Sequence, residues 1–220
     1  MKLEGIHHVT SITADAQANV DFYAGTLGLR MVKKTVNQDD PTVYHLFYGD
    51  DKGSPGLDLT FFEYPGVPQG RAGAGMIHRI VLRVGSEGAL DFWADRLGGG
   101  RRSAGSLVFT DPEGLELELR AVKTPDEALV AARPEIPREV AIQGMEEVRA
   151  YTADPEASRG LLEGALGFAP PFSMACVRTE SSPCLPARIE KQPMQPAVIS
   201  LDILLLRPPS ACCATVNWFI

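Results

Sequence analysis

A block of eight amino acids recurs along this chain at a regular interval, and this repeat limits the folds available to it. Asp-Phe-Tyr-Ala-Gly-Thr-Leu-Gly at 21–28 matches Asp-Phe-Trp-Ala-Asp-Arg-Leu-Gly at 91–98, 70 positions later, and 161–168 fits the same frame with an offset of one. In each block the apolar spacing is that of a helix, and a Leu-Gly pair marks the helix end. Strand-like segments precede the blocks, at 5–12, 76–84 and 145–152. The chain is therefore predicted to be a tandem of similar modules.

The first unit shows the order of elements within a module. A strand at 6–12 is followed by a helix at about 16–27 and by three strands at 30–36, 43–48 and 57–62. Turn-forming Asp, Gly and Pro residues separate the strands. This order predicts an α+β fold built of tandem βαβββ modules, with the third module incomplete.

The repeat also predicts where the modules begin and end. We expect a first module at 1–63, a shortened second module at 76–122, the start of a third module at 140–168 and a non-matching tail at 169–220. All four cysteines lie in this tail, and no two of them form a CxxC pair. Neither a zinc ribbon, a redox motif nor a catalytic cysteine is therefore predicted.

Charge and hydropathy exclude several classes of partner. The formal net charge is −7, and an acidic surface repels nucleic acid and anionic membranes. A hydrophobic content of 45% with 22% charged residues is typical of a globular domain. No segment has 18 consecutive apolar residues, so we expect no membrane-spanning helix. Because the first residues also lack an apolar signal core, we expect a cytoplasmic protein.

Three residues are candidate metal ligands. His8 and His78 lie 70 positions apart in the first strands of their units, and Glu118 lies in the last strand of the second unit. Two imidazoles and one carboxylate on one face form the ligand set of divalent iron, which leaves positions open for substrate and oxygen. The alternative is that His78 and Glu118 are ordinary strand residues.

Three further residues have different predicted roles. Alternation along the strand predicts that His7 points away from the face of His8, as a packing or supporting residue. Thr10 shares the face of His8, so its hydroxyl could orient a ligand or a bound phenol. His45 lies between Tyr44 and Leu46 in a strand, where we expect a hydrogen-bonded core histidine.

Several segments carry a resemblance to a known family. Gly-Ile-His-His-Val-Thr at 5–10, Asn-Val-Asp-Phe-Tyr at 19–23 and Leu-Gly-Leu-Arg at 27–30 resemble the vicinal oxygen chelate superfamily of glyoxalases, bleomycin-resistance proteins and dioxygenases. Val-Lys-Lys-Thr-Val-Asn at 32–37 and Leu-Thr-Phe-Phe at 59–62 resemble its hydroquinone ring-cleaving dioxygenase branch. The resemblance extends from residue 1 to about residue 168.

The resemblance implies an activity and a site. His8 would be an iron ligand of the first module, with His7 and Thr10 near the substrate. Members of the branch have four modules, and their other two ligands come from the fourth, which this sequence does not match. Without it the chain could be inactive, unless His78 and Glu118 complete a site with His8.

The predicted function is that of a metal-dependent ring-cleaving dioxygenase relative acting on hydroquinone or catechol-type aromatics. The expected cofactor is iron(II), with manganese(II) or zinc(II) as alternatives, and the expected partners are a small aromatic substrate, dioxygen and a second copy in a homodimer. Two other functions remain open: a non-redox metalloenzyme of the glyoxalase type, and a metal-free protein that binds aromatic drugs and confers resistance.

Overall fold

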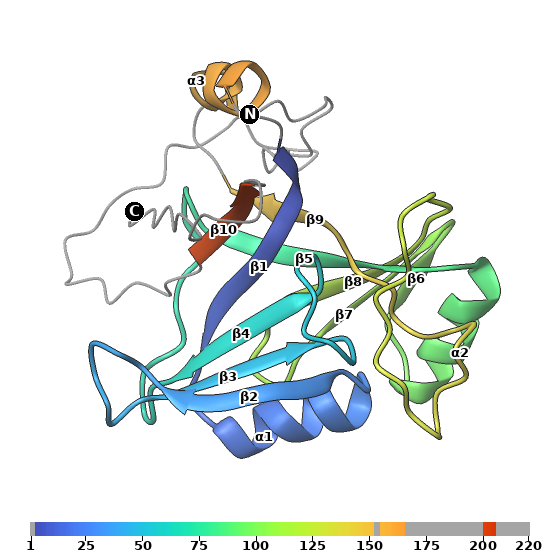
Figure 1. Cartoon of the computed structure of the whole chain (residues 1–220), viewed down its shortest axis with the longest axis horizontal. Helices are drawn as coiled ribbons and strands as arrows, with labels where there is room; N and C mark the ends of the chain where they lie inside the picture. The colour runs from blue at the N-terminus through green and yellow to red at the C-terminus, as the bar shows by residue number, and fades with distance from the viewer. Residues whose placement is uncertain (1–2, 152–154, 166–199, 206–220) are drawn as a thin grey trace.

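The computed structural model describes residues 3–151, 155–165 and 200–205. The first module consists of β1 (Leu3–Thr13), α1 (Ala16–Val20), the wider π-helical turn η1 (Asp21–Thr26), β2 (Arg30–Val36), β3 (Tyr44–Gly49) and β4 (Asp58–Glu63). The second consists of β5 (Ile77–Val84), α2 (Glu87–Arg96), β6 (Arg101–Ser103), β7 (Ser106–Thr110) and β8 (Glu116–Ala121). The predicted α+β fold of tandem βαβββ modules is confirmed (Figure 1).

The remaining described elements follow the second module. They are β9 (Met145–Ala150), α3 (Pro155–Arg159), the turn η2 (Gly160–Ala165) and β10 (Ser200–Leu205). The first three have the strand–helix order of a module's beginning. Most of the predicted tail lies outside the described residues. Within the predicted tail, β10 pairs antiparallel with β1.

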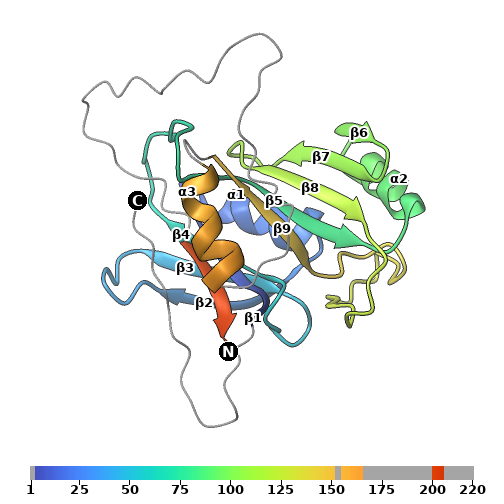
Figure 2. The same ribbon diagram turned by 90° about the horizontal axis from the view of Figure 1, so that it is seen from above.

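The strands form two sheets of the same design, which Figure 2 shows side by side. Their orders are β10-β1-β4-β3-β2 and β6-β7-β8-β5-β9. In each module the first strand runs parallel to the last, as β1 does to β4 and β5 to β8. On its other side each first strand has an antiparallel neighbour, β10 for β1 and β9 for β5. The two modules therefore have matching strand environments.

Local sequence signals set the limits of the two longer module helices. Asp15 caps the first helix by accepting hydrogen bonds from two backbone amides, and Ser86 caps α2 by accepting one from the Ala89 amide. Gly28 and Gly98 follow the helix ends at φ +69° and +68°, where a side chain would be strained. No helix in the described ranges is long and apolar enough to cross a bilayer.

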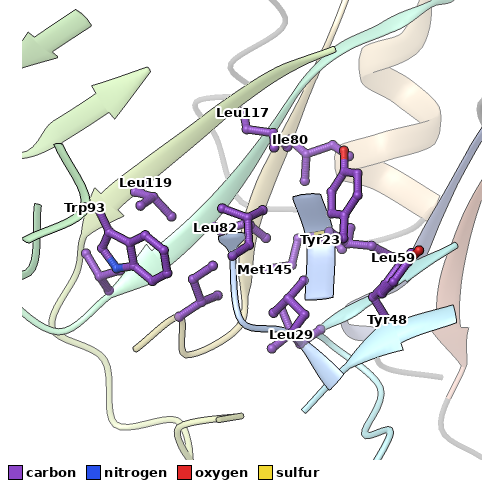
Figure 3. Close-up of a cluster of buried hydrophobic side chains, with 14 of the residues drawn as sticks. Tyr23, Leu29, Tyr48, Leu59, Ile80, Leu82, Trp93, Leu117, Leu119 and Met145 are labelled. Atoms are coloured by element: carbon purple, nitrogen blue, oxygen red, sulfur yellow. The ribbon is translucent and has the colours of Figure 1, made fainter. Parts of the chain in front are cut away.

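One buried cluster joins the two modules (Figure 3). It contains Tyr23, Leu59, Ile80, Trp93 and Leu117, among others. The hydroxyl of Tyr23 in η1 donates a hydrogen bond of 3.0 Å to the Asp111 carboxylate in the turn before β8, and both residues are buried. The modules therefore share a core rather than folding as separate domains.

Candidate functional site

Strand alternation divides the side chains of β1 and β4 between the core and a second face of the first sheet. Val9 and Leu59 lie opposite each other and are buried in the core, so their strand neighbours point to the second face. We call that surface the site face; its members are His8, Thr10, Asp58, Thr60 and Phe62, with His45 and Phe47 from the adjacent β3.

Three possible metal ligands meet at one end of the site face. One nitrogen from each of His7 and His8 and one oxygen of Asp58 lie within 4.8 Å of one another, and no other such group occurs among the described residues. The two Nδ1 atoms are 2.9 Å apart. Nitrogens bound about 2.1 Å from one ion in adjacent positions lie about 3 Å apart, so the spacing fits shared coordination.

The position of His7 corrects an expectation. Alternation predicted that His7 and His8 point to opposite faces, yet their Nδ1 atoms are in contact. The register of β1 against β10 shifts between Ile6 and His8. An irregularity of this kind breaks the alternation of side chains, because one residue is left out of the regular pairing. His7 thereby joins the group of possible ligands.

Asp58 was not predicted as a site residue. It lies opposite His8 because β4 runs parallel to β1, a pairing between distant segments of the chain that no local sequence pattern reveals. Burial raises the pKa of the Asp58 carboxyl to about 6, because an apolar environment disfavours its charged form. A bound cation beside it would stabilise that charged form.

Thr10 lies next to this group along β1. Its side chain is buried, and its hydroxyl oxygen accepts a hydrogen bond of 2.8 Å from Thr60. A hydroxyl that accepts one bond keeps its own hydrogen for another. The predicted role of Thr10 in orienting a bound oxygen therefore remains open to it.

The second sheet places different residues at the matching positions. Arg79 lies opposite Glu116, and the next pair, Ile80 with Leu117, belongs to the core. Comparison with the pairs of the first sheet makes Arg79, not His78, the counterpart of His8. The first strands of the two modules are therefore offset by 71 positions in the numbering, not by 70. A one-residue change of register moves a side chain to the other face.

The π-helical turn η1 explains why the spacing of 70 misleads. The helix caps Asp15 and Ser86 are 71 positions apart, whereas Gly28 and Gly98 at the helix ends are 70 apart. The first helix thus holds one more residue than α2. A π-turn accommodates a single extra residue within a helix. The spacing of 70 positions that holds at the helix ends consequently does not hold for β1 and β5, the strands that precede the two helices.

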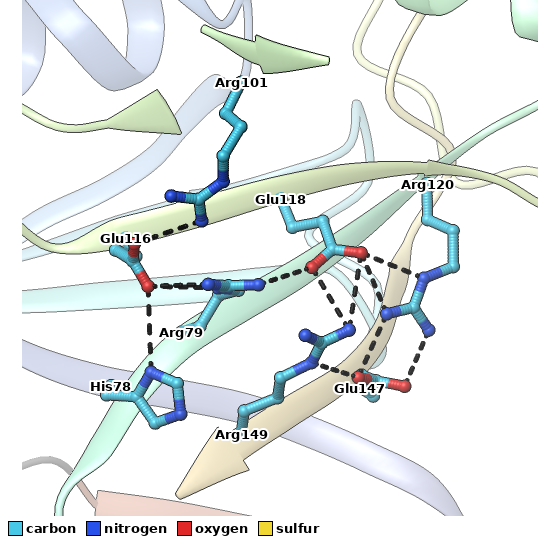
Figure 4. A network of polar contacts seen from close by, with 8 residues as sticks. All are labelled: His78, Arg79, Arg101, Glu116, Glu118, Arg120, Glu147 and Arg149. Carbon is cyan, nitrogen blue, oxygen red and sulfur yellow. Dashed lines mark hydrogen bonds and ion pairs between the residues drawn. The ribbon is translucent and has the colours of Figure 1, made fainter. Parts of the chain in front are cut away.

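An ion-pair network fills the matching face of the second sheet (Figure 4). Glu118 is at its centre, paired with Arg79 at 3.0 Å, Arg120 at 2.9 Å and Arg149 at 3.2 Å. Burial alone would raise the pKa of Glu118, but hydrogen bonds from Arg120, Ser106 and Arg79 outweigh it and hold that pKa below its usual value. Its carboxylate is therefore already engaged by cations.

His78 lies at the edge of this network. Its buried ring stacks on Tyr151 at 4.1 Å between centroids, and neither ring nitrogen has a hydrogen-bond partner. The Nδ1 atom is 3.8 Å from a Glu116 oxygen. Across the described part of the chain, the structure does not bring His8, His78 and Glu118 together as one group of ligands; His8 groups with His7 and Asp58 instead.

Comparisons with known proteins agree with this architecture. Residues 5–119 match the family model for the Glyoxalase/Bleomycin resistance protein/Dioxygenase superfamily. MhqA of Bacillus subtilis (strain 168), provisionally named a ring-cleaving dioxygenase, is 43% identical over 182 residues, which cover 76% of this chain and 56% of MhqA. Chlorohydroquinone/hydroquinone 1,2-dioxygenase of Sphingobium indicum is 34% identical over 155 residues, which cover 65% of this chain and 48% of that enzyme.

A solved structure shows the same similarity. A Bacillus subtilis protein provisionally described as a dioxygenase superposes with a TM-score of 0.70 at 39% identity, covering 76% of this chain and 56% of that one. The chain spans about half the length of the curated relatives it matches.

Proposed function

The chain belongs to the Glyoxalase/Bleomycin resistance protein/Dioxygenase superfamily, and on that basis we propose that its first module is the metal- and substrate-binding part of a ring-cleaving dioxygenase. The observation that carries the proposal is the meeting of His7, His8 and Asp58 on the site face. The similarity to a hydroquinone dioxygenase supports dihydroxylated aromatic rings as the substrate class. Dioxygen is the second proposed substrate.

The donor set suits a divalent ion. The imidazole of His8 and the carboxylate of Asp58 are ligand types used by non-haem iron(II) enzymes, and manganese(II) or zinc(II) also accepts them. We propose iron(II) as the native ion. When bound, it would supply Lewis acidity toward a phenolic oxygen and redox chemistry toward dioxygen.

Each side chain of the group has a proposed role. His8 and Asp58 hold the ion from adjacent strands. His7 accepts the proton of the substrate hydroxyl, a task suited to an imidazole near neutral pH. Thr10 donates its remaining hydroxyl hydrogen to a substrate oxygen and so orients the ring.

Metal analysis combined with oxygen uptake tests the proposal. We expect the purified chain, loaded anaerobically with iron(II), to retain the ion and to consume oxygen when hydroquinone is added. His8→Ala should lose more iron affinity than the roughly 10- to 100-fold typical of a lost supporting residue. His7→Ala should retain iron but consume oxygen much more slowly, because the proton acceptor is missing.

His78→Ala is the matched control, since His78 is the histidine that repeat spacing alone would choose. It should bind iron as the unsubstituted chain does. Equal iron binding by His8→Ala would overturn the proposed site. Iron binding with no hydroquinone-dependent oxygen uptake would instead favour a non-redox metalloenzyme.

A further inference from the structure

A fourth histidine, His45, shares the site face and lies at the opposite end from the possible metal ligands. Register places Asp58 opposite His8 at one end of the face and Phe62 opposite His45 at the other. Four positions along β4 separate Asp58 from Phe62, which is about 13 Å along the backbone at roughly 3.3 Å per residue. The long side chains of His8 and His45 extend from the neighbouring strands over the same face. Thr60 and its neighbour Phe47 lie between them. The site face therefore has two polar ends joined by a partly aromatic middle.

The imidazole of His45 has an unused hydrogen-bonding atom. Its Nε2 is buried and has no hydrogen-bond partner. Aromatic rings surround it: Phe62 stacks on it at 3.9 Å between centroids, and Phe47 lies at 4.0 Å. A buried polar atom without a partner costs free energy, so such an atom on a ligand-binding face indicates a group that arrives with the ligand.

The charge state of His45 suits a neutral ligand. Burial, together with the nearby positive charges of His8 and Lys33, lowers the pKa of His45 to about 4. The ring is therefore neutral at physiological pH. Its Nε2 can accept a hydrogen bond from a hydroxyl group, or donate one to it, without the desolvation cost of a charge.

We propose that His45 binds the hydroxyl group at the far end of the aromatic substrate, and that it thereby selects para-dihydroxy rings over ortho-dihydroxy rings. This inference rests on the proposed function of the same site. A para-dihydroxy ring with one oxygen at the metal ligands directs its other oxygen away from them. An ortho-dihydroxy ring has both oxygens at the same end and leaves His45 without a partner.

Equilibrium binding to zinc-loaded protein tests the selection without involving turnover. Hydroquinone and catechol are titrated separately into the chain by calorimetry, because zinc(II) has no redox chemistry. His45→Phe keeps a flat ring between Phe47 and Phe62 but removes the nitrogen. We expect its affinity for hydroquinone to fall about tenfold, the typical effect of one neutral hydrogen bond, while its affinity for catechol stays within about twofold.

Two further variants separate binding from folding. His45→Gln places an amide near the lost Nε2 and should restore part of the hydroquinone affinity. Tyr44→Phe, at the exposed neighbouring position, should bind both compounds as the unsubstituted chain does. Thermal melting of each variant checks its fold.

The possible results point to different conclusions. Unchanged hydroquinone affinity in His45→Phe overturns the role of His45 and leaves the proposed function intact. An equal loss of affinity for hydroquinone and for catechol, with no recovery of affinity in His45→Gln, also overturns the proposed selection. If the unsubstituted chain binds neither compound, the proposed function fails, and the role of His45 fails with it.

Discussion

At Glu118 three guanidinium groups converge on one buried carboxylate. Arg79 and Arg120 come from the second module, and Arg149 comes from β9. Removing one partner from such a network leaves buried charges without compensation, which is usually strongly destabilising. The network therefore holds the side chains on the matching face of the second sheet in one arrangement. The site face of the first sheet instead has the imidazoles of His8 and His45.

Glu118→Gln should lower the free energy of unfolding by about 3 kcal/mol at pH 7, because three cations then face an uncharged amide. The pKa of Glu118 is held below its ordinary value, so its contribution is present above about pH 4.5 and is lost as pH falls through the folded-state pKa. Denaturant unfolding between pH 3 and 7 measures this. The gap between variant and unsubstituted chain should narrow toward acid pH.

Glu127→Gln is the control, because Glu127 and Lys52 form an exposed pair at 3.9 Å with little expected effect on stability. A Glu118→Gln protein as stable as the unsubstituted chain at pH 7 would show that the network contributes nothing net.

At the scale of elements, the π-helical turn η1 separates two registers of the repeat. Before it, matching positions of the two modules differ by 71 in the numbering, and after it they differ by 70. This difference exchanges His78 for Arg79 as the counterpart of His8. The same helix ends just before Gly28, whose left-handed conformation turns the chain into β2.

Gly28→Ala should destabilise the fold by about 2 kcal/mol or more, because an added Cβ would be strained at φ +69° and would collide with the Ile136 side chain. Gly25→Ala is the matched comparison, since a Cβ there meets nothing within 4 Å. Because alanine lowers the conformational entropy of the unfolded chain, Gly25→Ala should raise the free energy of unfolding by about 0.5 kcal/mol. Thermal melts of both variants decide it, and equal melting temperatures would contradict the role assigned to Gly28.

At the scale of the whole molecule, the modules are joined by one buried cluster and by the bond from Tyr23 to Asp111. A substitution that destabilises one module should therefore also destabilise the other. The first strand of each module also has an antiparallel neighbour, which gives the two sheets the same width.

Leu59→Ala removes a fully buried side chain of the first module and should cost about 3 kcal/mol. Trp93 lies in the core of the second module, so its fluorescence, in a Trp218→Phe background, reports on that module. We expect its unfolding midpoint to fall together with that of the circular dichroism signal. A Trp93 transition that stays in place while the overall signal shifts would mean that the modules unfold independently.

The sequence by itself determined the module repeat, the order of elements within a module and the family, and it predicted His8 as a metal ligand. These features are local or periodic: helix ends, strand alternation and short motifs recur in the chain and can be recognised without knowing which strands pair.

Only the tertiary structure decided how the residues of the candidate site come together. The pairing of β1 with β4 brings Asp58 to His8, the break in strand register brings His7 beside them, and β3 adds His45 to the same face. Each of these depends on strand register, and shifting a strand by one residue exchanges its faces. The extra residue in η1 shifts the first strand of one module by one residue relative to that of the other. Counting 70 positions along the sequence therefore gives His78 as the counterpart of His8, whereas the strand pairing gives Arg79.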